Sequence, residues 1–302
     1  MPMFRFPFPA LLGGLCLALS GLTHAATYSH ENGSVTLDKT PERIVTLEWS
    51  LGEIALDLGV TPIAMAETDG YREWVAEPAL PDSVADLGSR REPNLEVLQA
   101  LKPELILVPR DYAPLLNKLE QIAPVMVLSI YTEDRQPWQR AEQITLQMGE
   151  VLGKETEAQA LLANINAQFA SYREQLSAQQ GPVALVNIVD PRHLRVHGGQ
   201  GLYQATLDKL GLKNAWHGET NYWGFATQGV EQLQVKPNTS LFYFQPVPDK
   251  TLEIMTNSPL WRARDFVREQ RVHSLEPVWA FGGLHAAERL ARLLTEQLTS
   301  TP

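Results

Sequence analysis

The chain has 302 residues, a formal net charge of −10 and one cysteine, Cys16. An acidic chain without basic clusters is not typical of proteins that bind nucleic acid or anionic membrane surfaces. A single cysteine excludes an intramolecular disulfide framework and a cysteine metal cluster. The length exceeds what one ordinary core needs, so it favours two lobes.

The first segment, residues 1–25, has the layout of a cleaved secretory signal peptide. Arg5 supplies a positive charge, an apolar run broken by proline and glycine follows, and small residues mark a cleavage site after Ala25. The apolar run is too short to favour a membrane anchor. A lipid anchor on Cys16 is the alternative, but Leu15 is bulky where lipoprotein signals carry a small residue. We therefore expect export of a mature chain without cysteine and without stable membrane insertion.

Residues 26–153 alternate short β-rich runs with helical patterns. Strands alternating with helices predict a mainly parallel sheet covered on both faces, and hence an N-terminal α/β lobe. The predicted strands are 43–49, 62–66, 84–87, 105–108 and 125–129, and the predicted helices are 51–58, 95–101 and 115–122.

A helical pattern follows over 138–180, interrupted at Gly153. Within 154–180 the apolar residues Leu161, Ile165 and Phe169 fall at helical spacing and give the segment one apolar face. A helix of about 25 residues is roughly 37 Å long, the diameter of a small domain. The pattern fits a single long helix that joins two lobes, and it fits equally a helix lying along one lobe.

Residues 181–302 return to alternating strands and helices and predict a second α/β lobe. The fold class is therefore α/β, with two lobes of mainly parallel sheet joined by a long helix. Ligands of open α/β sheets bind outside the carboxyl ends of the strands, so both lobes would offer their loops to one cleft. The predicted strands are 182–188, 193–197, 240–244 and 272–275, and the predicted helices are 202–210 and 284–298.

Aromatic residues cluster where predicted strands end, among Gly, Asn, Pro, Asp and Glu. Such neighbours are typical of loops rather than of a core. Several loop aromatics around one cleft suit a bulky, partly apolar ligand held without covalent chemistry. Arg90 and Arg91 follow the strand 84–87, where a guanidinium can direct donors at ligand oxygens, although a solvated surface arginine is the alternative. The aromatic residues are Trp49, Trp74, Tyr112, Trp216, Trp223 and Trp279.

Motifs of catalysis are missing from the sequence, which has no nucleophile elbow, zinc-protease helix, phosphate loop or dinucleotide fingerprint. His193 and His197 alternate with apolar residues as in a strand, where four residues span about 13 Å, too far for one metal ion. A secreted hydrolase using Glu219 with His217 is the alternative, but the sequence offers it no nucleophile and no orienting group. We therefore expect that the protein is not an enzyme, that it needs no cofactor and that its side chains coordinate no metal ion.

At these same positions the chain resembles the periplasmic ferric hydroxamate siderophore-binding proteins, which belong to the class III, helical-backbone binding proteins. The resemblance extends from about residue 43 to the terminal helix. It rests on Leu-Glu-Trp at 47–49, the loop around Trp74, Arg-Arg-Glu-Pro-Asn-Leu-Glu at 90–96, Asp-Pro-Arg-His at 190–193 and Trp-His-Gly-Glu-Thr-Asn-Tyr-Trp-Gly at 216–224.

The resemblance implies a shallow aromatic cleft between two lobes, with Arg90 and Tyr112 as donors to the hydroxamate oxygens. Phe281 stands where a relative carries tyrosine. Arg195 stands where a leucine lines the pocket of the relative, and an added arginine beside the ligand favours chelates that carry a free carboxylate. Three hydroxamates give Fe(III) six hard oxygen ligands, so the protein supplies none. The cleft walls implied by the resemblance are Trp49, Trp74, Trp216, Asn221, Trp223 and Trp279.

The resemblance also implies a monomer in the periplasm that delivers its ligand to an inner-membrane ABC permease, docking through one acidic residue in each lobe. Glu231 falls at the acidic position of the second lobe. The position in the first lobe is Asn117, and Glu120, one helical turn further on, can substitute for it. The same fold with another large ligand, such as a corrinoid, haem or a catecholate chelate, is the nearest alternative.

Overall fold

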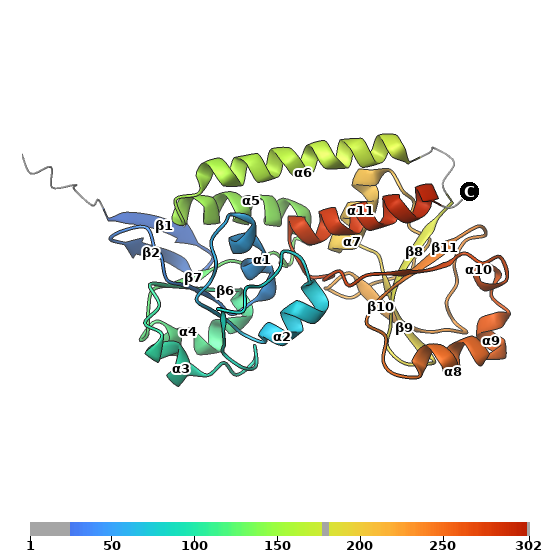
Figure 1. Ribbon diagram of the computed structural model, residues 1–302, viewed down its shortest axis with the longest axis horizontal. Helices are drawn as coiled ribbons and strands as arrows, with labels where there is room; N and C mark the ends of the chain where they lie inside the picture. Colours follow the sequence, from blue (N-terminus) through green and yellow to red (C-terminus); the bar gives the residue numbers. More distant parts are fainter. Residues whose placement is uncertain (1–24, 177–180, 301–302) are drawn as a thin grey trace, which may run out of the picture.

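The computed structural model describes residues 25–176 and 181–300, which form two α/β lobes with a long helix, α6 (Glu155–Gln175), lying over both of them (Figure 1). The predicted two-lobed α/β fold is thereby confirmed. The predicted signal peptide, with Cys16, lies outside the described residues apart from Ala25.

The sheet of the first lobe is parallel throughout, in the order β5-β4-β3-β6-β7. Its strands are short but fall inside the predicted ranges. All of them except the edge strand β5 are buried on both faces, which explains why the Leu-Ile-Leu-Val run of β6 is apolar at every position. The strands are β3 (Ile44–Thr46), β4 (Ala64–Met65), β5 (Ala85–Asp86), β6 (Leu105–Val108) and β7 (Val125–Val127).

Helices of the first lobe follow its strands. Asn94 caps α3, because its Oδ1 accepts hydrogen bonds from Glu96 N (3.1 Å) and Val97 N (3.0 Å). An antiparallel hairpin that the sequence analysis did not predict precedes the sheet, formed by β1 (Ala26–His30) and β2 (Gly33–Leu37). The helices are α1 (Trp49–Asp57), α2 (Thr68–Gly70), a π-helical turn (Tyr71–Val75), α3 (Leu95–Ala100), a 3-10 turn (Arg110–Leu115) and α4 (Leu116–Leu119).

The sheet of the second lobe has the order β10-β9-β8-β11-β12 and is mixed rather than mainly parallel. β8 pairs with β9 and β9 with β10 in antiparallel fashion, while β11 pairs in parallel with β8 and β12. A short turn joins β8 to β9, in which Asp190 Oδ1 accepts from Arg192 N (2.8 Å) and His193 N (3.0 Å). A connection this short allows only antiparallel pairing, because two neighbouring parallel strands need a long crossover connection between them.

The strands of this sheet match the predicted ranges closely, except that β10 was not predicted. The three short helices between β11 and β12 were also not predicted. The strands are β8 (Val183–Ile188), β9 (His193–His197), β10 (Phe225–Gly229), β11 (Ser240–Phe244) and β12 (Val272–Leu275), and the helices are α7 (Leu202–Leu210), α8 (Thr251–Asn257), α9 (Pro259–Arg262) and α10 (Asp265–Arg268).

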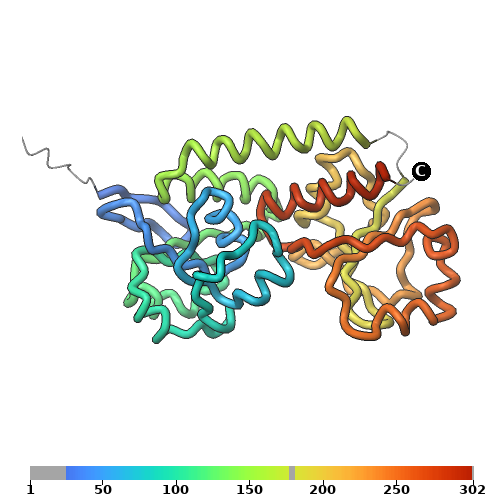
Figure 2. Tube along the Cα trace, in the orientation of Figure 1, coloured from blue at the N-terminus to red at the C-terminus, as the bar shows by residue number. Residues whose placement is uncertain are grey.

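Three longer helices join the lobes into one body. α5 (Pro137–Val151) ends near Gly153, whose φ of 64° allows the chain to turn, and α6 (Glu155–Gln175) then runs for about 32 Å over both lobes (Figure 2). The last helix, α11 (Leu284–Ser300), packs on α6 and α7, and its first turns contact α1 of the first lobe. The lobes are therefore joined along the chain by α6, and they are held together a second time by the packing of α11 on α1.

The approach of this last segment to the first lobe is close. A Cβ atom added to Gly282 would lie 2.4 Å from Ala286 Cβ and 2.7 Å from Glu53 Oε2, so only glycine fits there. Within residues 25–176 and 181–300, no helix has the length and apolar character needed to cross a membrane.

Candidate functional site

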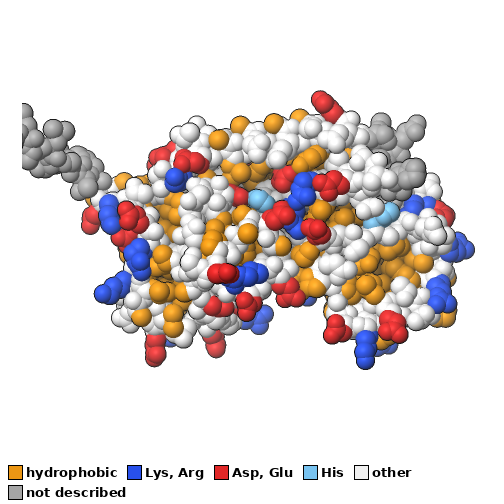
Figure 3. Space-filling model, in the orientation of Figure 1, with side chains coloured by type: hydrophobic (Ala, Val, Ile, Leu, Met, Phe, Trp, Pro, Cys, Tyr) orange, Lys and Arg blue, Asp and Glu red, His pale blue; other side chains and the backbone are white. Residues whose placement is uncertain are grey.

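A cavity of about 740 Å³ lies between the lobes, at the carboxyl ends of strands from both sheets. The sequence analysis predicted a cleft at this place, because ligands of open α/β sheets bind outside the carboxyl ends of the strands. Figure 3 shows the outline of the molecule notched between the lobes, on the side away from α6. From the first lobe the cavity is lined by Trp49, Glu67, Gly70, Glu73, Trp74 and Arg90, and from the second by Asn187, Ile188, Val189, Arg195, His197, Pro246, Val247, Pro248, Asp249, Val278, Trp279, Ala280 and Phe281.

Arg90 lies at the centre of this site. Its Nε donates to Glu67 Oε2 at 2.8 Å, and its Nη1 lies 3.6 Å from Glu48 Oε2. The guanidinium carbon lies 3.8 Å from the ring centroid of Trp49 and 5.5 Å from that of Trp279. Two carboxylates and two indoles thus fix the orientation of a guanidinium that remains a quarter exposed to the cleft.

The two acids respond to this setting in opposite ways. Burial raises the pKa of Glu48, and the nearby charge of Arg90 offsets this only in part. Burial also opposes ionisation of Glu67, but hydrogen bonds from the backbone and guanidinium of Arg90 outweigh it and lower the pKa of Glu67. Glu67 is therefore the firm counter-ion of Arg90, and it uses both of its oxygens for this residue.

The aromatic wall is continuous. Trp49 and Trp279 meet edge to face, with ring centroids 4.8 Å apart. Phe281 lies 5.1 Å from Trp279 and 5.5 Å from Trp223. Trp49 comes from the first lobe and the other rings from the second, so the wall crosses the junction between the lobes. Trp74 lines the cavity beside it.

A second, smaller cavity of about 430 Å³ adjoins the first, with Arg90, Arg195, Trp279 and Phe281 as shared lining. We call it the arginine pocket. It is further lined by Glu48, Ser50, Arg91, Pro109, Arg110, Asp111, Leu128, Ser129, Ile130, Tyr131, Trp223 and Phe225.

Tyr131 is a site residue that the sequence analysis missed. Its ring lies 5.7 Å from both Trp223 and Phe281, and its hydroxyl donates across the lobe junction to Ala280 O at 2.7 Å. It follows the predicted strand 125–129, so the rule that identified the other strand-end aromatics could have found it.

Three predicted site residues lie away from the walls of these two cavities. Tyr112 is buried, and its hydroxyl lies within hydrogen-bonding distance of two backbone carbonyls, Leu47 O (2.7 Å) and Arg90 O. Trp216 packs in the core of the second lobe. Asn221 Oδ1 accepts from the backbone N–H groups of its neighbours at 223 and 225. Tyr112 nevertheless lines a further cavity of about 570 Å³ together with Arg90, Glu48 and Glu67.

The histidines of β9 do not form a pair. His193 is exposed and bonds to Asp190, whereas His197 is buried, with Nε2 2.6 Å from Asn187 Oδ1. Burial lowers the pKa of His197 to about 3, so the ring stays neutral. Over the described parts of the chain, no group of three or more His, Cys, Asp or Glu side chains is placed to hold a metal ion.

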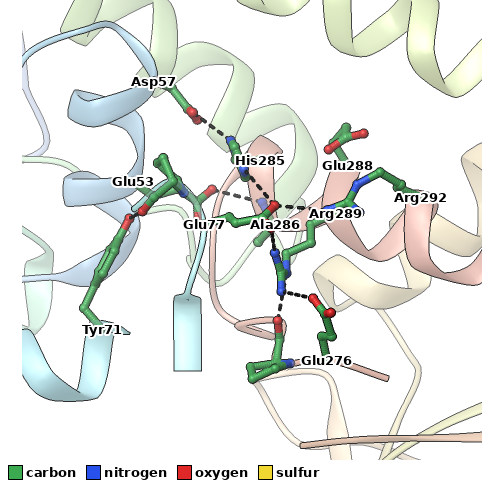
Figure 4. A network of polar contacts seen from close by, with 12 residues as sticks. Glu53, Asp57, Tyr71, Glu77, Glu276, His285, Ala286, Glu288, Arg289 and Arg292 are labelled. Carbon is green, nitrogen blue, oxygen red and sulfur yellow. Dashed lines mark hydrogen bonds and ion pairs between the residues drawn. The ribbon is translucent and has the colours of Figure 1, made fainter. Parts of the chain in front are cut away.

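A buried polar network beside the cleft holds α11 to the first lobe (Figure 4). Glu53 Oε1 accepts from Gly283 N (2.9 Å) and Ala286 N (3.2 Å) at the start of α11, and His285 Nδ1 lies 2.7 Å from Asp57 Oδ1. Burial raises the pKa of Glu53 to about 7. Burial opposes the charge on His285, but the hydrogen bond and charge of Asp57 outweigh it and raise the pKa of His285 to about 9.

The two acids expected to dock on a permease are both exposed. Glu231 follows β10, and Glu120 ends α4, one turn beyond Asn117.

Comparison with known proteins identifies the chain. The sequence pattern of the periplasmic binding protein family matches residues 44–278. The iron(3+)-hydroxamate-binding protein FhuD of Escherichia coli is 35% identical over 84% of this chain and 86% of its own length, and the Fe(3+) dicitrate-binding periplasmic protein FecB of the same organism is 30% identical over 93% and 92%. The crystal structure of the siderophore-binding protein FhuD from Vibrio cholerae, bound to Fe3+-Desferal, matches with a TM-score of 0.80 and 32% identity over 85% of this chain and 98% of that one. The two-lobed fold, the cleft at the strand ends and these similarities together place the chain in the periplasmic binding protein family.

Proposed function

We propose that this protein is the periplasmic substrate-binding component of an ABC importer, and that it captures a ferric hydroxamate siderophore in the cleft between its lobes. The observation that carries the proposal is Arg90 held over Trp49 and beside Trp279, at a cavity large enough for a chelate. The guanidinium offers donors to hydroxamate oxygens, and the indoles offer an apolar wall to the organic body of the chelate. The two curated relatives reported above support a ferric chelate as the ligand, because their names describe binders of ferric hydroxamate and of ferric dicitrate.

The iron in this proposal is cargo, coordinated by the siderophore, and the protein acts without a cofactor and without catalysis. We place the mature chain in the periplasm after cleavage of residues 1–25. We divide it into an N-terminal lobe (26–153), a connecting helix (154–180) and a C-terminal lobe (181–302), and we propose that it acts as a monomer.

Titration of the mature chain with siderophores tests this function. Ferric hydroxamates should quench tryptophan fluorescence saturably, because Trp49 and Trp279 lie against the cavity, and ferric catecholates should quench much less at equal concentration. Trp279→Phe should reduce the quenching, whereas Trp261→Phe, which alters a buried indole in the core of the second lobe, should not. Equal quenching by both classes of chelate, or by neither, would refute the ligand assignment. Turnover of chromogenic esters or glycosides would point instead to a hydrolase.

Delivery to the permease is a separate part of the proposal. Glu231 and Glu120 are exposed acids, one in each lobe, that can pair with permease arginines. Glu231→Ala should leave siderophore binding intact and reduce uptake by cells in part, and Glu120→Ala should have a smaller effect, because each exposed ion pair contributes about 1 kcal/mol or less. Unchanged uptake by the double variant at limiting siderophore would show that docking uses other residues.

A further inference from the structure

The arginine pocket carries positive charge that the protein compensates only in part. Arg91 and Arg110 follow β5 and β6 of the first lobe, and Arg195 lies on β9 of the second. In residues 25–176 and 181–300, none of these three side chains forms an ion pair, whereas Arg90 is paired with Glu67 and Glu48. The guanidinium of Arg195 rests instead 5.2 Å from the ring centroid of Phe225.

The two compartments of the cleft differ in charge. Four arginines and two acids line the arginine pocket, and one of the acids, Glu48, is already engaged by Arg90. The larger cavity has three acids, Glu67, Glu73 and Asp249, and shares Arg90 and Arg195 with the pocket. The chain as a whole has a net charge of −10, so a local excess of arginine in one pocket indicates a binding site for a specific anion.

The walls of the pocket favour an organic anion over a small inorganic one. Tyr131, Trp223 and Phe281 form one side of it, with Phe281 on the boundary between the two compartments. A flexible arm that leaves the chelate in the larger cavity can pass Phe281 along this aromatic side and end among guanidinium groups. Guanidinium groups bind carboxylates through paired hydrogen bonds, so a carboxylate is the end group that fits.

We propose that the arginine pocket is a subsite for a free carboxylate of the ligand, and that the natural siderophore is a ferric hydroxamate chelate carrying at least one carboxylate that does not bind iron. This inference rests on the proposed function. The larger cavity holds the chelate, and the arginine pocket selects among chelates by the charge of their side arms.

The test uses ferric Desferal, whose chain ends in an ammonium group, with its N-acetyl and N-succinyl derivatives, whose chains end in a neutral amide and a carboxylate. All three share one hydroxamate core. We expect the succinyl complex to bind about five to ten times more tightly than the acetyl complex at low salt, because two or three partly exposed ion pairs contribute. The preference should shrink as ionic strength rises.

Substitutions locate the origin of the preference. In Arg195→Gln and in Arg110→Gln, the ratio of succinyl to acetyl affinity should fall by about threefold or more. In Arg173→Gln, which removes the same charge on α6, the ratio should stay as in the parent protein. The acetyl complex serves as the internal reference for folding in every variant.

The outcomes separate the two proposals. Binding of none of the three complexes would overturn the proposed function itself. Equal binding of all three, or weaker binding of the succinyl complex, would overturn the carboxylate subsite while leaving the hydroxamate site standing. A preference that survives unchanged in both arginine variants would also overturn it.

Discussion

Loss of the Glu53 side chain should weaken the junction between the lobes. Its Oε1 accepts from two backbone N–H groups at the start of α11, so a carboxylate of the first lobe caps a helix of the second (Figure 4). Glu53→Ala removes this acceptor in a place where water has no access, since Glu53 is fully buried.

The size of the effect follows from these two hydrogen bonds. Loss of a helix cap costs about 0.5–2 kcal/mol, and a buried N–H group left without an acceptor costs about 1–3 kcal/mol. The destabilised carboxylate that disappears with the substitution offsets part of this, because burial raises the pKa of Glu53 to about 7. We therefore expect Glu53→Ala to lower the free energy of unfolding by about 2–4 kcal/mol. Glu53→Gln should cost about 1 kcal/mol or less, because an amide oxygen can take the place of Oε1.

Urea unfolding at pH 7, followed by tryptophan fluorescence and circular dichroism, measures both variants against the parent protein. The Gln variant is the matched control, because it keeps the size and the acceptor and removes only the charge. The reasoning is refuted if Glu53→Gln is as destabilising as Glu53→Ala, or if Glu53→Ala leaves the unfolding midpoint unchanged.

Three further predictions concern the cleft and the junction. Arg90→Ala should weaken binding of a ferric hydroxamate by about 1.5–3 kcal/mol in calorimetric titration, which is the range for charge-assisted hydrogen bonds. Arg90→Lys should restore only part of this affinity, because an ammonium group lacks the planar set of N–H donors of a guanidinium. Full affinity in the Lys variant would contradict a role for the planar guanidinium. Tyr112→Phe should lower the free energy of unfolding by about 1 kcal/mol and also weaken binding, because the lost hydroxyl bonds to the backbone of Arg90; unchanged stability would argue against this bond. The pKa of His285 is raised to about 9, so its stabilising contribution is complete below about pH 6.5 and is lost as pH rises through 9, by up to about 3 kcal/mol. Urea unfolding between pH 7.5 and 9.5 should show this loss, and Asp57→Asn should flatten it; an equal slope in the variant would assign the titration to another group.

Periodicity and breakers located most of the strands and the longer helices, but not β1, β2, β10 or the short helices α8, α9 and α10. β6, β9, β11, β12 and α7 begin and end where the sequence analysis placed them. Except for β12, of which only Leu275 is buried, these elements are buried on one or both faces, so their apolar pattern is clear. The hairpin of β1 and β2 was missed because its polar residues face solvent along most of its length. The mixed pairing of the second sheet was missed because strand patterns do not reveal the direction of a neighbour.

The residues of the candidate site could likewise be predicted only in part from the sequence. The aromatic residues and Arg90 could be found because they stand directly after strands, and the carboxyl ends of the strands meet at the cleft. Trp216, by contrast, follows α7 in a sequence typical of a loop, and yet its side chain packs into the core of the second lobe. Its burial depends on residues distant in the sequence, so the local sequence does not reveal it. His285 bonds to Asp57, which lies more than two hundred positions earlier in the chain. Contacts at such separations leave no local pattern.

The same long-range contacts set an order of assembly. Glu53 and Asp57 belong to the first helix of the chain, but their partners lie in the last helix to be synthesised. While the ribosome is still producing the second lobe, the first lobe therefore carries two acids whose native partners do not yet exist. Contacts between distant parts of a chain form late and slowly. A first lobe that gains these two contacts only when the carboxyl terminus of the chain has emerged is therefore completed late in synthesis.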